Sequence, residues 1–340
     1  MKNTRRSFIK SLGGVAALAA AQPIMGMPAI IKDLYSTSTI HGVQLGTITY
    51  SFREMADQSP QAVLSYIKEC GISAVELMGN TAEIYAGAPE SSFSFGSMAA
   101  IFRKRQAKEE LSSDELKQLD EFTKAREAYA LEKSEWRKTA DMRKFEEFRK
   151  MYAKAGVSIY AFKPDAFGIR NTDADIHFGM RAAKALGAQS VTLEHPSVDE
   201  HTLKLGQIAE KYGLKVGYHG HEQQTPTFWD TALSQSPANS LNLDFGHYVA
   251  AGNAEPLAFV QKMHTHISSM HLKDRKSKEN GGANLLWGTG DTPVVEVLRL
   301  MRDNKYTFPA TVELEYEIPA GSNSVQEVKR CIEYAKNALS

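Results

Sequence analysis

Four short segments of this sequence place metal-binding or charged side chains directly after apolar runs. The segments read YHGHE, LDFGH, MHLKD and VELEYE, and they supply in turn His219 and His221, Asp244 and His247, His271 and Lys273, and Glu313 and Glu315. Such side chains are costly inside an apolar core unless they are paired or ligated. Four such endings in succession predict one rim of a barrel, where the side chains converge on a single metal ion.

The ligand types in these segments define the chemistry that we expect. Imidazole nitrogens and carboxylate oxygens suit one divalent ion of Mn, Co, Zn, Fe or Mg. A divalent ion that chelates a sugar carbonyl and the adjacent hydroxyl stabilises the enediolate formed when the proton beside the carbonyl leaves. A carboxylate or imidazole takes that proton. Its return to another carbon isomerises the sugar, its return to the opposite face epimerises it, and loss of a group from the next carbon is an elimination.

The apolar runs have the pattern of strands that are buried on both faces. They are short, rich in Val, Ile, Leu and Tyr, and without strict alternation; they span residues 43–48, 73–77, 157–162, 190–193, 215–218, 241–243, 267–270 and 310–312. Amphipathic helix patterns separate them, at residues 60–71, 173–187, 202–213, 256–263, 293–303 and 325–339. This alternation predicts an α/β fold, a closed (β/α)8 TIM barrel. A doubly wound open sheet is disfavoured, because GTITYSFRE at the first strand is not a Gly-rich phosphate turn.

One long insertion, residues 80–145, interrupts the alternation after the second strand. Its first part is rich in Gly, Ser and Pro and predicts a loop, while Ser112 and Glu115 have the spacing of a capping box that starts a helix. We expect a solvated helix hairpin on the barrel flank. A lid or dimer contact is the alternative, because the loops that follow barrel strands lie on the catalytic face.

The remaining strand ends add candidate residues. Glu76, Lys163 and Glu194 end the second, third and fourth strands. We predict that Glu194 or Glu313 binds metal and shuttles protons, and that His219 or His221 is the second base. His247, Lys273 and Glu315 complete the catalytic candidates, with Lys273 orienting substrate oxygens. The candidates for substrate contact are Lys163, Glu76, Trp287 and Arg275.

Structural roles are the alternatives for several of these residues. Asp244 and His247 have the spacing of a helix N-cap and a core imidazole. Glu313 is a candidate ion-pair partner of Lys273, and Glu315 of Arg275. Glu76 is more readily explained as a support or a substrate contact than as a ligand. Lys163 has either a substrate oxygen or a barrel carboxylate as its partner.

The order H-x-H, L-D-x-x-H, H-x-K-D and V-E-x-E resembles the xylose isomerase-like barrel superfamily, over roughly residues 40–340. The resemblance implies that one divalent ion is held by His219, Asp244, His271 and Glu313. The fifth strand departs from the commonest epimerase pattern, since His-Gly-His replaces a Glu-Asn-His type ending, and Glu194 is a candidate for the missing carboxylate. Residues 281–293 resemble the loop that follows the seventh strand in this superfamily. That loop is expected to close over the site, with Trp287 as an apolar wall; phosphate binding by its glycines is left open.

The N-terminus has the features of an export signal. Arg5 and Arg6 precede a short apolar, Ala-rich stretch, which resembles a twin-arginine signal peptide over residues 1–29. We expect a bacterial periplasmic protein that uses the twin-arginine machinery and has no stable membrane anchor, since the stretch is too short and weakly apolar to span a bilayer. Lys plus Arg and Asp plus Glu are both 40, so no electrostatic capture of nucleic acid is expected.

These observations favour a metal-dependent isomerase or epimerase that acts on a free sugar or keto-sugar. The first alternative is a lyase or hydratase that eliminates the aglycone from 3-keto-glycosides, or an enzyme of the inosose dehydratase type. The second is a carbohydrate-binding barrel without turnover. A DNA-repair nuclease is disfavoured, because the multi-metal nucleases of this superfamily need additional His ligands on the early strands. Whether the chain forms a homo-oligomer is left open by the sequence.

Overall fold

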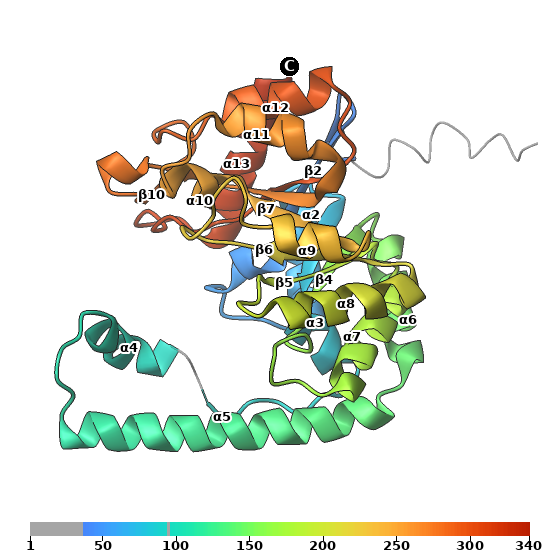
Figure 1. Ribbon diagram of the computed structural model, residues 1–340, viewed down its shortest axis with the longest axis vertical. Helices are drawn as coiled ribbons and strands as arrows, with labels where there is room; N and C mark the ends of the chain where they lie inside the picture. The colour runs from blue at the N-terminus through green and yellow to red at the C-terminus, as the bar shows by residue number, and fades with distance from the viewer. Residues whose placement is uncertain (1–36, 94–95) are drawn as a thin grey trace, which may run out of the picture. The chain divides into compact units, whose positions relative to one another are not determined.

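The computed structural model describes residues 37–93 and 96–340, and eight parallel strands form its centre (Figure 1). They are β2 (Val43–Ile48), β3 (Ala74–Met78), β4 (Ser158–Lys163), β5 (Ser190–Glu194), β6 (Lys215–His219), β7 (Asn239–Asp244), β8 (Ile267–Leu272) and β11 (Ala310–Val312). Each strand pairs in parallel with its neighbour, and β11 pairs with β2, which closes the ring. The predicted (β/α)8 barrel is confirmed.

Helices connect the strands, as a parallel barrel requires. They are α2 (Pro60–Glu69), α3 (Gly79–Tyr85), α6 (Met142–Lys154), α7 (Asp173–Leu186), α8 (Asp199–Tyr212), α9 (Asp230–Gln235), α10 (Phe245–Ala250), α11 (Pro256–Met263), α12 (Val294–Asp303) and α13 (Ser324–Leu339). Local sequence sets their ends: Ser59 accepts the N–H of Ala62 at the start of α2, and Gly187 ends α7 with a left-handed φ of 79°.

Short elements complete the fold. They are the strands β1 (Thr39–Ile40), β9 (Asp274–Arg275) and β10 (Asn284–Leu285), and the 3-10 turns η1 (Thr49–Phe52), η2 (Gly96–Met98), η3 (His264–His266) and η4 (Lys278–Asn280). β9 and β10 form an antiparallel ribbon in the segment after β8. None of the helices in the described part of the chain is long and apolar enough to cross a membrane. The predicted signal segment, residues 1–29, lies outside the described residues, and export stays a prediction.

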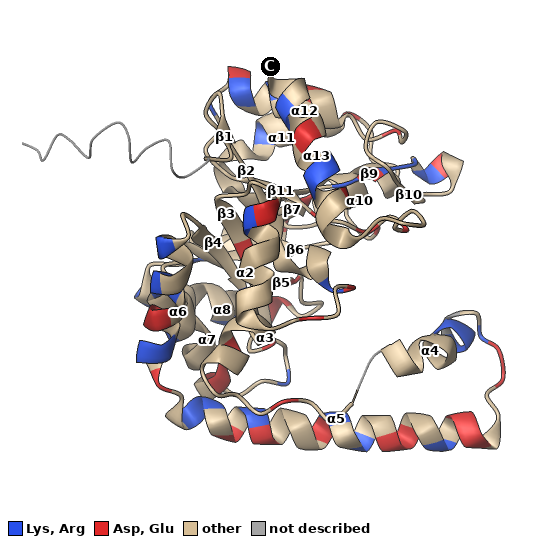
Figure 2. Cartoon of the chain, turned by 180° about the vertical axis from the view of Figure 1, so that it is seen from behind, with Lys and Arg blue, Asp and Glu red and all other residues tan. Residues whose placement is uncertain are grey.

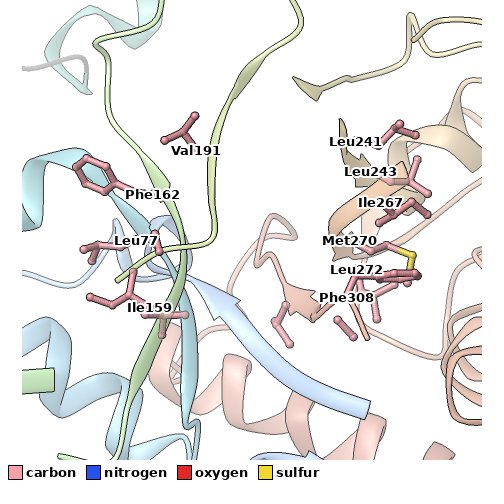
Figure 3. Packing of buried hydrophobic residues seen from close by; sticks show 14 of the residues in the cluster. Leu77, Ile159, Phe162, Val191, Leu241, Leu243, Ile267, Met270, Leu272 and Phe308 are labelled. Atoms are coloured by element: carbon pink, nitrogen blue, oxygen red, sulfur yellow. The ribbon is translucent and has the colours of Figure 1, made fainter. Parts of the chain in front are cut away.

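The strands separate a polar interior from an apolar outer layer. Along β7 and β8, the buried polar residues Asn242, Asp244, Ser269 and His271 alternate with buried apolar ones. Because successive side chains of a strand point to opposite faces, the apolar set faces the surrounding helices. Figure 3 shows these apolar side chains: Leu77, Ile159, Phe162 and Val191 group on one side of the barrel, and Leu241, Leu243, Met270 and Leu272 on the other. The core therefore lies outside the strand ring and leaves the interior for polar groups.

The insertion after β3 contains two further helices, α4 (Ala99–Gln106) and α5 (Ser113–Thr139). The predicted capping box is present at the start of α5, where Ser112 and Glu115 bond each other's backbone N–H. Lys and Arg alternate with Asp and Glu along α5 (Figure 2), which is typical of a solvated helix. Met98, Ile101 and Phe122 form a small apolar cluster that is separate from the main core.

Candidate metal centre and active site

Four buried side chains from four consecutive strands bring one donor atom each to a single point. His219 ends β6, Asp244 ends β7, His271 lies near the end of β8 and Glu313 follows β11. Their donor atoms all lie within 4.8 Å of one another, and none of the four residues is more than 5% exposed. These are the residues that the superfamily resemblance implies as metal ligands. Two imidazoles and two carboxylates are a donor set that suits a divalent first-row ion or Mg.

The ring of His219 is held with one nitrogen free for a ligand. Its Nδ1 lies 2.8 Å from Asn242 Oδ1. The amide nitrogen of Asn242 donates to Glu76 and Ser269, so its oxygen is the acceptor and His219 Nδ1 carries the hydrogen. The lone pair is therefore on Nε2, which faces Asp244 Oδ2 at 3.8 Å. Burial lowers the pKa of His219 to about 3, which favours the neutral, ligating form.

His271 lies between two carboxylates. Its Nε2 is 2.9 Å from Glu76 Oε2, and its Nδ1 is 2.8 Å from Glu313 Oε2. Burial alone would lower the pKa of His271, but Glu313 and Glu76 outweigh it and raise this pKa to about 10. Nδ1 faces the other donors and Nε2 faces away from them, so Glu76 fixes the ring in the orientation that ligation by Nδ1 requires.

The two acidic donors already face a cation. The ammonium group of Lys273 lies 2.8 Å from both Asp244 Oδ2 and Glu313 Oε2. Burial opposes ionisation of both carboxyls, but Lys273 outweighs it and holds their pKa values below the ordinary range. The second oxygen of Asp244 accepts the N–H of His247 and caps α10. Asp244 thus has the predicted N-cap role while its other oxygen remains directed at the donor set.

A second layer of side chains lies nearer the solvent. Glu194 accepts from Lys163 at 3.0 Å and lies 3.0 Å from His221 Nε2. The side chains of His221 and Glu194 are 46% and 54% exposed, so they are accessible to a substrate. The hydrogen bond to Glu194 raises the pKa of His221. Glu194 is not in the group of four donors, and this arrangement favours proton transfer over ligation as its role.

The ring of His247 lies beside that of His221, with centroids 4.5 Å apart, and has one nitrogen directed toward the donor set. An Arg275 N–H donates to its Nδ1, so the neutral ring carries its hydrogen on Nε2. This Nε2 is buried without a hydrogen-bond partner, 3.7 Å from Glu315 Oε2 and 3.9 Å from Asp244 Oδ2. Burial lowers the pKa of His247. The ring is therefore positioned to donate a hydrogen bond into the site.

The predicted ion pairs are partly rearranged. Lys273 pairs with Glu313 as expected, and also with Glu315 at 2.7 Å. The predicted pairing of Arg275 with Glu315 is wrong, because Arg275 lies 2.5 Å from Glu222. Glu222 was missed, although it is the last residue of the quoted YHGHE segment.

The predicted substrate contacts fall into different environments. Glu76 is fully buried beneath the histidines, which favours the supporting role over a substrate contact. Lys163 is 16% exposed beside Glu194. The ring of Trp287 meets Tyr334 of α13 edge-on at 6.0 Å. That contact turns Trp287 toward the helix layer, and its role as an apolar wall stays a prediction.

The chain matches the xylose isomerase-like TIM barrel family over residues 64–337. It belongs to this family. Among curated proteins, an inosose dehydratase from Clostridium perfringens is 27% identical over 163 residues, which cover 42% of this chain and 54% of that protein. The chain thus matches about half the length of that relative.

Solved structures of other proteins superpose on this chain as the same type of barrel. A 3-keto-D-glucoside 4-epimerase from E. coli superposes with a TM-score of 0.56 at 10% identity, covering 87% of this chain and 99% of that one. The IOLI protein with a bound zinc atom superposes with a TM-score of 0.54 at 13% identity, covering 88% and 98%. At these identities the likeness shows the xylose isomerase-like fold alone.

Proposed function

We propose that this xylose isomerase-like barrel is a divalent-metal-dependent enzyme that isomerises or epimerises a sugar or keto-sugar through an enediolate. The observation that supports this most is the meeting of four buried metal donors with adjacent proton-transfer groups, His221 with Glu194 and His247 with Glu315. A structural histidine cluster needs no exposed acid–base pair beside it.

The residues present fit a divalent ion. His219 Nε2, Asp244 Oδ2, His271 Nδ1 and Glu313 Oε2 would hold it, since the opposite nitrogen of each ring is engaged by Asn242 or Glu76. When bound, the ion polarises a substrate carbonyl and stabilises the negative charge of the enediolate. The Lys273 ammonium, held by Glu315, is placed to donate to a substrate oxygen.

The proton-transfer groups lie next to each other beside the donor set, with the ring centroids of His221 and His247 4.5 Å apart. His221 and Glu194 share a hydrogen bond, so either group can take a proton from a carbon and pass it to the other. Glu315 and His247 Nε2 lie 3.7 Å apart and can return a proton to the same carbon or to a neighbouring one. His219 is buried with its free nitrogen among the metal donors, which leaves His221 as the second base.

Elimination is the second candidate, because the curated relative in the comparison is a dehydratase. It begins with the same proton abstraction beside a carbonyl. The groups that return a proton in an epimerase would instead protonate the leaving hydroxyl or alkoxide. This candidate covers inososes and 3-keto-glycosides as substrates.

Solvent deuterium exchange tests the function. The protein, loaded with Mn, Co, Zn, Fe or Mg, is incubated in D2O with free sugars, 3-keto-glucosides and inososes, and the products are followed by NMR. We expect metal-dependent deuterium entry at the carbon beside the carbonyl. An intact product indicates isomerisation or epimerisation, and an unsaturated product indicates elimination. Absence of exchange with every metal and substrate would refute the proposal.

Two variants separate binding from chemistry in this experiment. His221→Asn leaves all four donors in place, so metal binding should persist while exchange falls by about 10²–10⁴-fold. Glu313→Gln removes a donor, so metal binding and exchange should fall together. Equal metal loss in both variants would place His221 in the donor set instead.

We also propose that the chain is exported by the twin-arginine machinery to the periplasm, on the strength of Arg5 and Arg6. Replacement of both by Lys should retain the protein in the cytoplasm of a bacterial host. Cell fractionation and immunoblotting measure this; an unchanged periplasmic fraction would contradict the proposal.

A further inference from the structure

Lys163, Lys273 and Arg275, the cations beside the donor set, are each already paired with a carboxylate. Lys163 lies 3.0 Å from Glu194, and Arg275 lies 2.5 Å from Glu222. Lys273 lies within 2.8 Å of carboxylate oxygens from three different residues. A phosphate subsite uses unpaired Arg or Lys side chains, or free backbone N–H groups, to compensate its charge. These cations are not available for that purpose without breaking an existing ion pair.

The backbone N–H groups of the glycine-rich segment after β8 are also paired with a carboxylate of the chain. In TIM barrels the loops after the seventh and eighth strands often bind phosphate. Here the carboxylate of Asp274, a residue only 2% exposed, accepts the N–H groups of Gly288, Gly290 and Thr292 at 2.7, 2.9 and 3.2 Å. The N–H groups that would form an anion nest are thus occupied by a buried carboxylate of the chain itself.

The helix that starts beside the donor set is capped in the same way. α10 follows Asp244 directly, and Asp244 Oδ1 accepts the His247 N–H at its first turn. An anionic group is therefore already present where an exogenous phosphate would otherwise gain from the helix terminus.

Carboxylates outnumber the lysine and arginine side chains beside the donor set. Lys163, Lys273 and Arg275 face the carboxylates of Glu194, Glu222, Asp244, Glu313 and Glu315. A phosphate group would therefore meet a carboxylate of its own sign at each cation that could bind it.

From these contacts, and resting on the proposed function, we infer that the site takes an uncharged polyhydroxylated carbonyl compound, a free keto-sugar, keto-glycoside or cyclitol ketone, and discriminates against phosphate esters. A phosphate group is disfavoured because the cations already have carboxylate partners and the N–H groups of the glycine loop already donate to Asp274. The exposed carboxylates and His221 suit hydroxyl groups, which both donate and accept hydrogen bonds.

Matched substrate pairs test this inference. Deuterium exchange by the metal-loaded protein is compared for D-fructose with D-fructose 6-phosphate and D-glucose with D-glucose 6-phosphate, and for any keto-glucoside or inosose that exchanges, with its phosphate ester. We expect kcat/KM to be higher for the free compound by at least about 100-fold, because like charges in contact cost several kcal/mol. Equal or faster exchange with the esters would overturn the inference.

Two variants that each remove one negative charge test whether the ion pairs cause the preference for the free compound. Glu222→Gln leaves Arg275 without its carboxylate, and the preference for the free compound should then fall about tenfold. Glu279→Gln removes the same charge from an exposed position in η4, where the structure gives it no ion pair with a cation beside the donor set. The preference should not change in this control. An unchanged preference in Glu222→Gln would overturn the pairing argument.

A measurement without turnover separates this inference from the proposed function. A ligand that binds only the folded protein raises its melting temperature in a saturable way. Millimolar D-glucose 6-phosphate should give no saturable increase over sodium chloride of equal ionic strength. If no compound exchanges deuterium and the ester also gives no increase, the proposed enzyme function fails while the exclusion of phosphate stands. A saturable increase would overturn the exclusion whatever the exchange experiment shows.

Discussion

One buried carboxylate, Glu76, sets the orientation of both imidazole donors. It accepts from His271 Nε2 directly, and through Asn242 it fixes the ring of His219. Thr192 donates to its other oxygen at 2.7 Å. Burial opposes its ionisation, but His271 outweighs this and holds the pKa of Glu76 below its ordinary value. A carboxylate behind a ligating histidine orients the ring and increases its basicity.

We therefore expect Glu76→Gln to weaken divalent metal binding by about 10–100-fold. The Gln amide keeps the size of the side chain but loses the charge that supports His271. Calorimetric titration with Co or Zn measures the affinity, and the visible absorption of bound Co reports its geometry. Thr192→Val is the matched control, since it removes a hydrogen bond to the same carboxylate without touching a histidine. A similar loss of affinity in both variants would contradict the orienting role.

At the scale of single elements, strand ends were predictable because their signals are local. The run that ends in Asp244 lies within one strand, and the charged residue directly follows the apolar residues that mark the strand. The cap of α5 was equally local, since Ser112 and Glu115 are three residues apart. Strand ends and helix caps depend on residues that are close together in the chain, so their signals can be read from the sequence.

Partners that meet across elements were less predictable. Arg275 follows β8 and Glu222 follows β6, and their contact depends on how two loops approach each other. The residues from Gly281 to Pro293 were expected to close over the site, and this stays a prediction. Asp274 accepts the N–H groups of Gly288 and Gly290 in this loop, and Asp291 accepts from the Ser277 N–H and the Asn280 side chain just before it. This loop is therefore organised by its own carboxylates, and nothing in its glycine content indicates that.

At the scale of the whole molecule, a buried ion cluster joins the insertion to the barrel. Lys133 and Arg137 of α5 are 2% and 3% exposed. Lys133 lies 2.6 Å from Glu83 of α3, and Arg137 lies 3.2 Å from Asp175 of α7 and also bonds Asp165. The sequence indicated a solvated helix over this stretch, and the outer part of α5 agrees. The buried anchor was not predictable, because Lys and Arg on a charged helix give no sign of which ones face the barrel.

Arg137→Met tests this anchor. It leaves the carboxylates of Glu83 and Asp175 buried without one of their cations, so the free energy of unfolding should fall by about 3–5 kcal/mol at neutral pH. Denaturant titration measures the change. Lys124→Met is the matched control on the same helix, because its pair with Asp120 is exposed and its loss should have no measurable effect.

The pH dependence of the stability difference between wild type and Arg137→Met identifies the cause of the loss. Burial opposes ionisation of Asp175, but hydrogen bonds from Thr172, Ser134 and Arg137 outweigh it and lower its pKa. A lowered pKa contributes stability above the unfolded value of about 4, and that stability is lost as the pH falls through the folded value. The gap between wild type and Arg137→Met should therefore shrink below about pH 4, where protonated carboxyls no longer need the cation. A gap that stays constant down to the acid transition would assign the loss to packing of the Arg137 side chain, and the ion cluster would then not be what holds the insertion on the barrel.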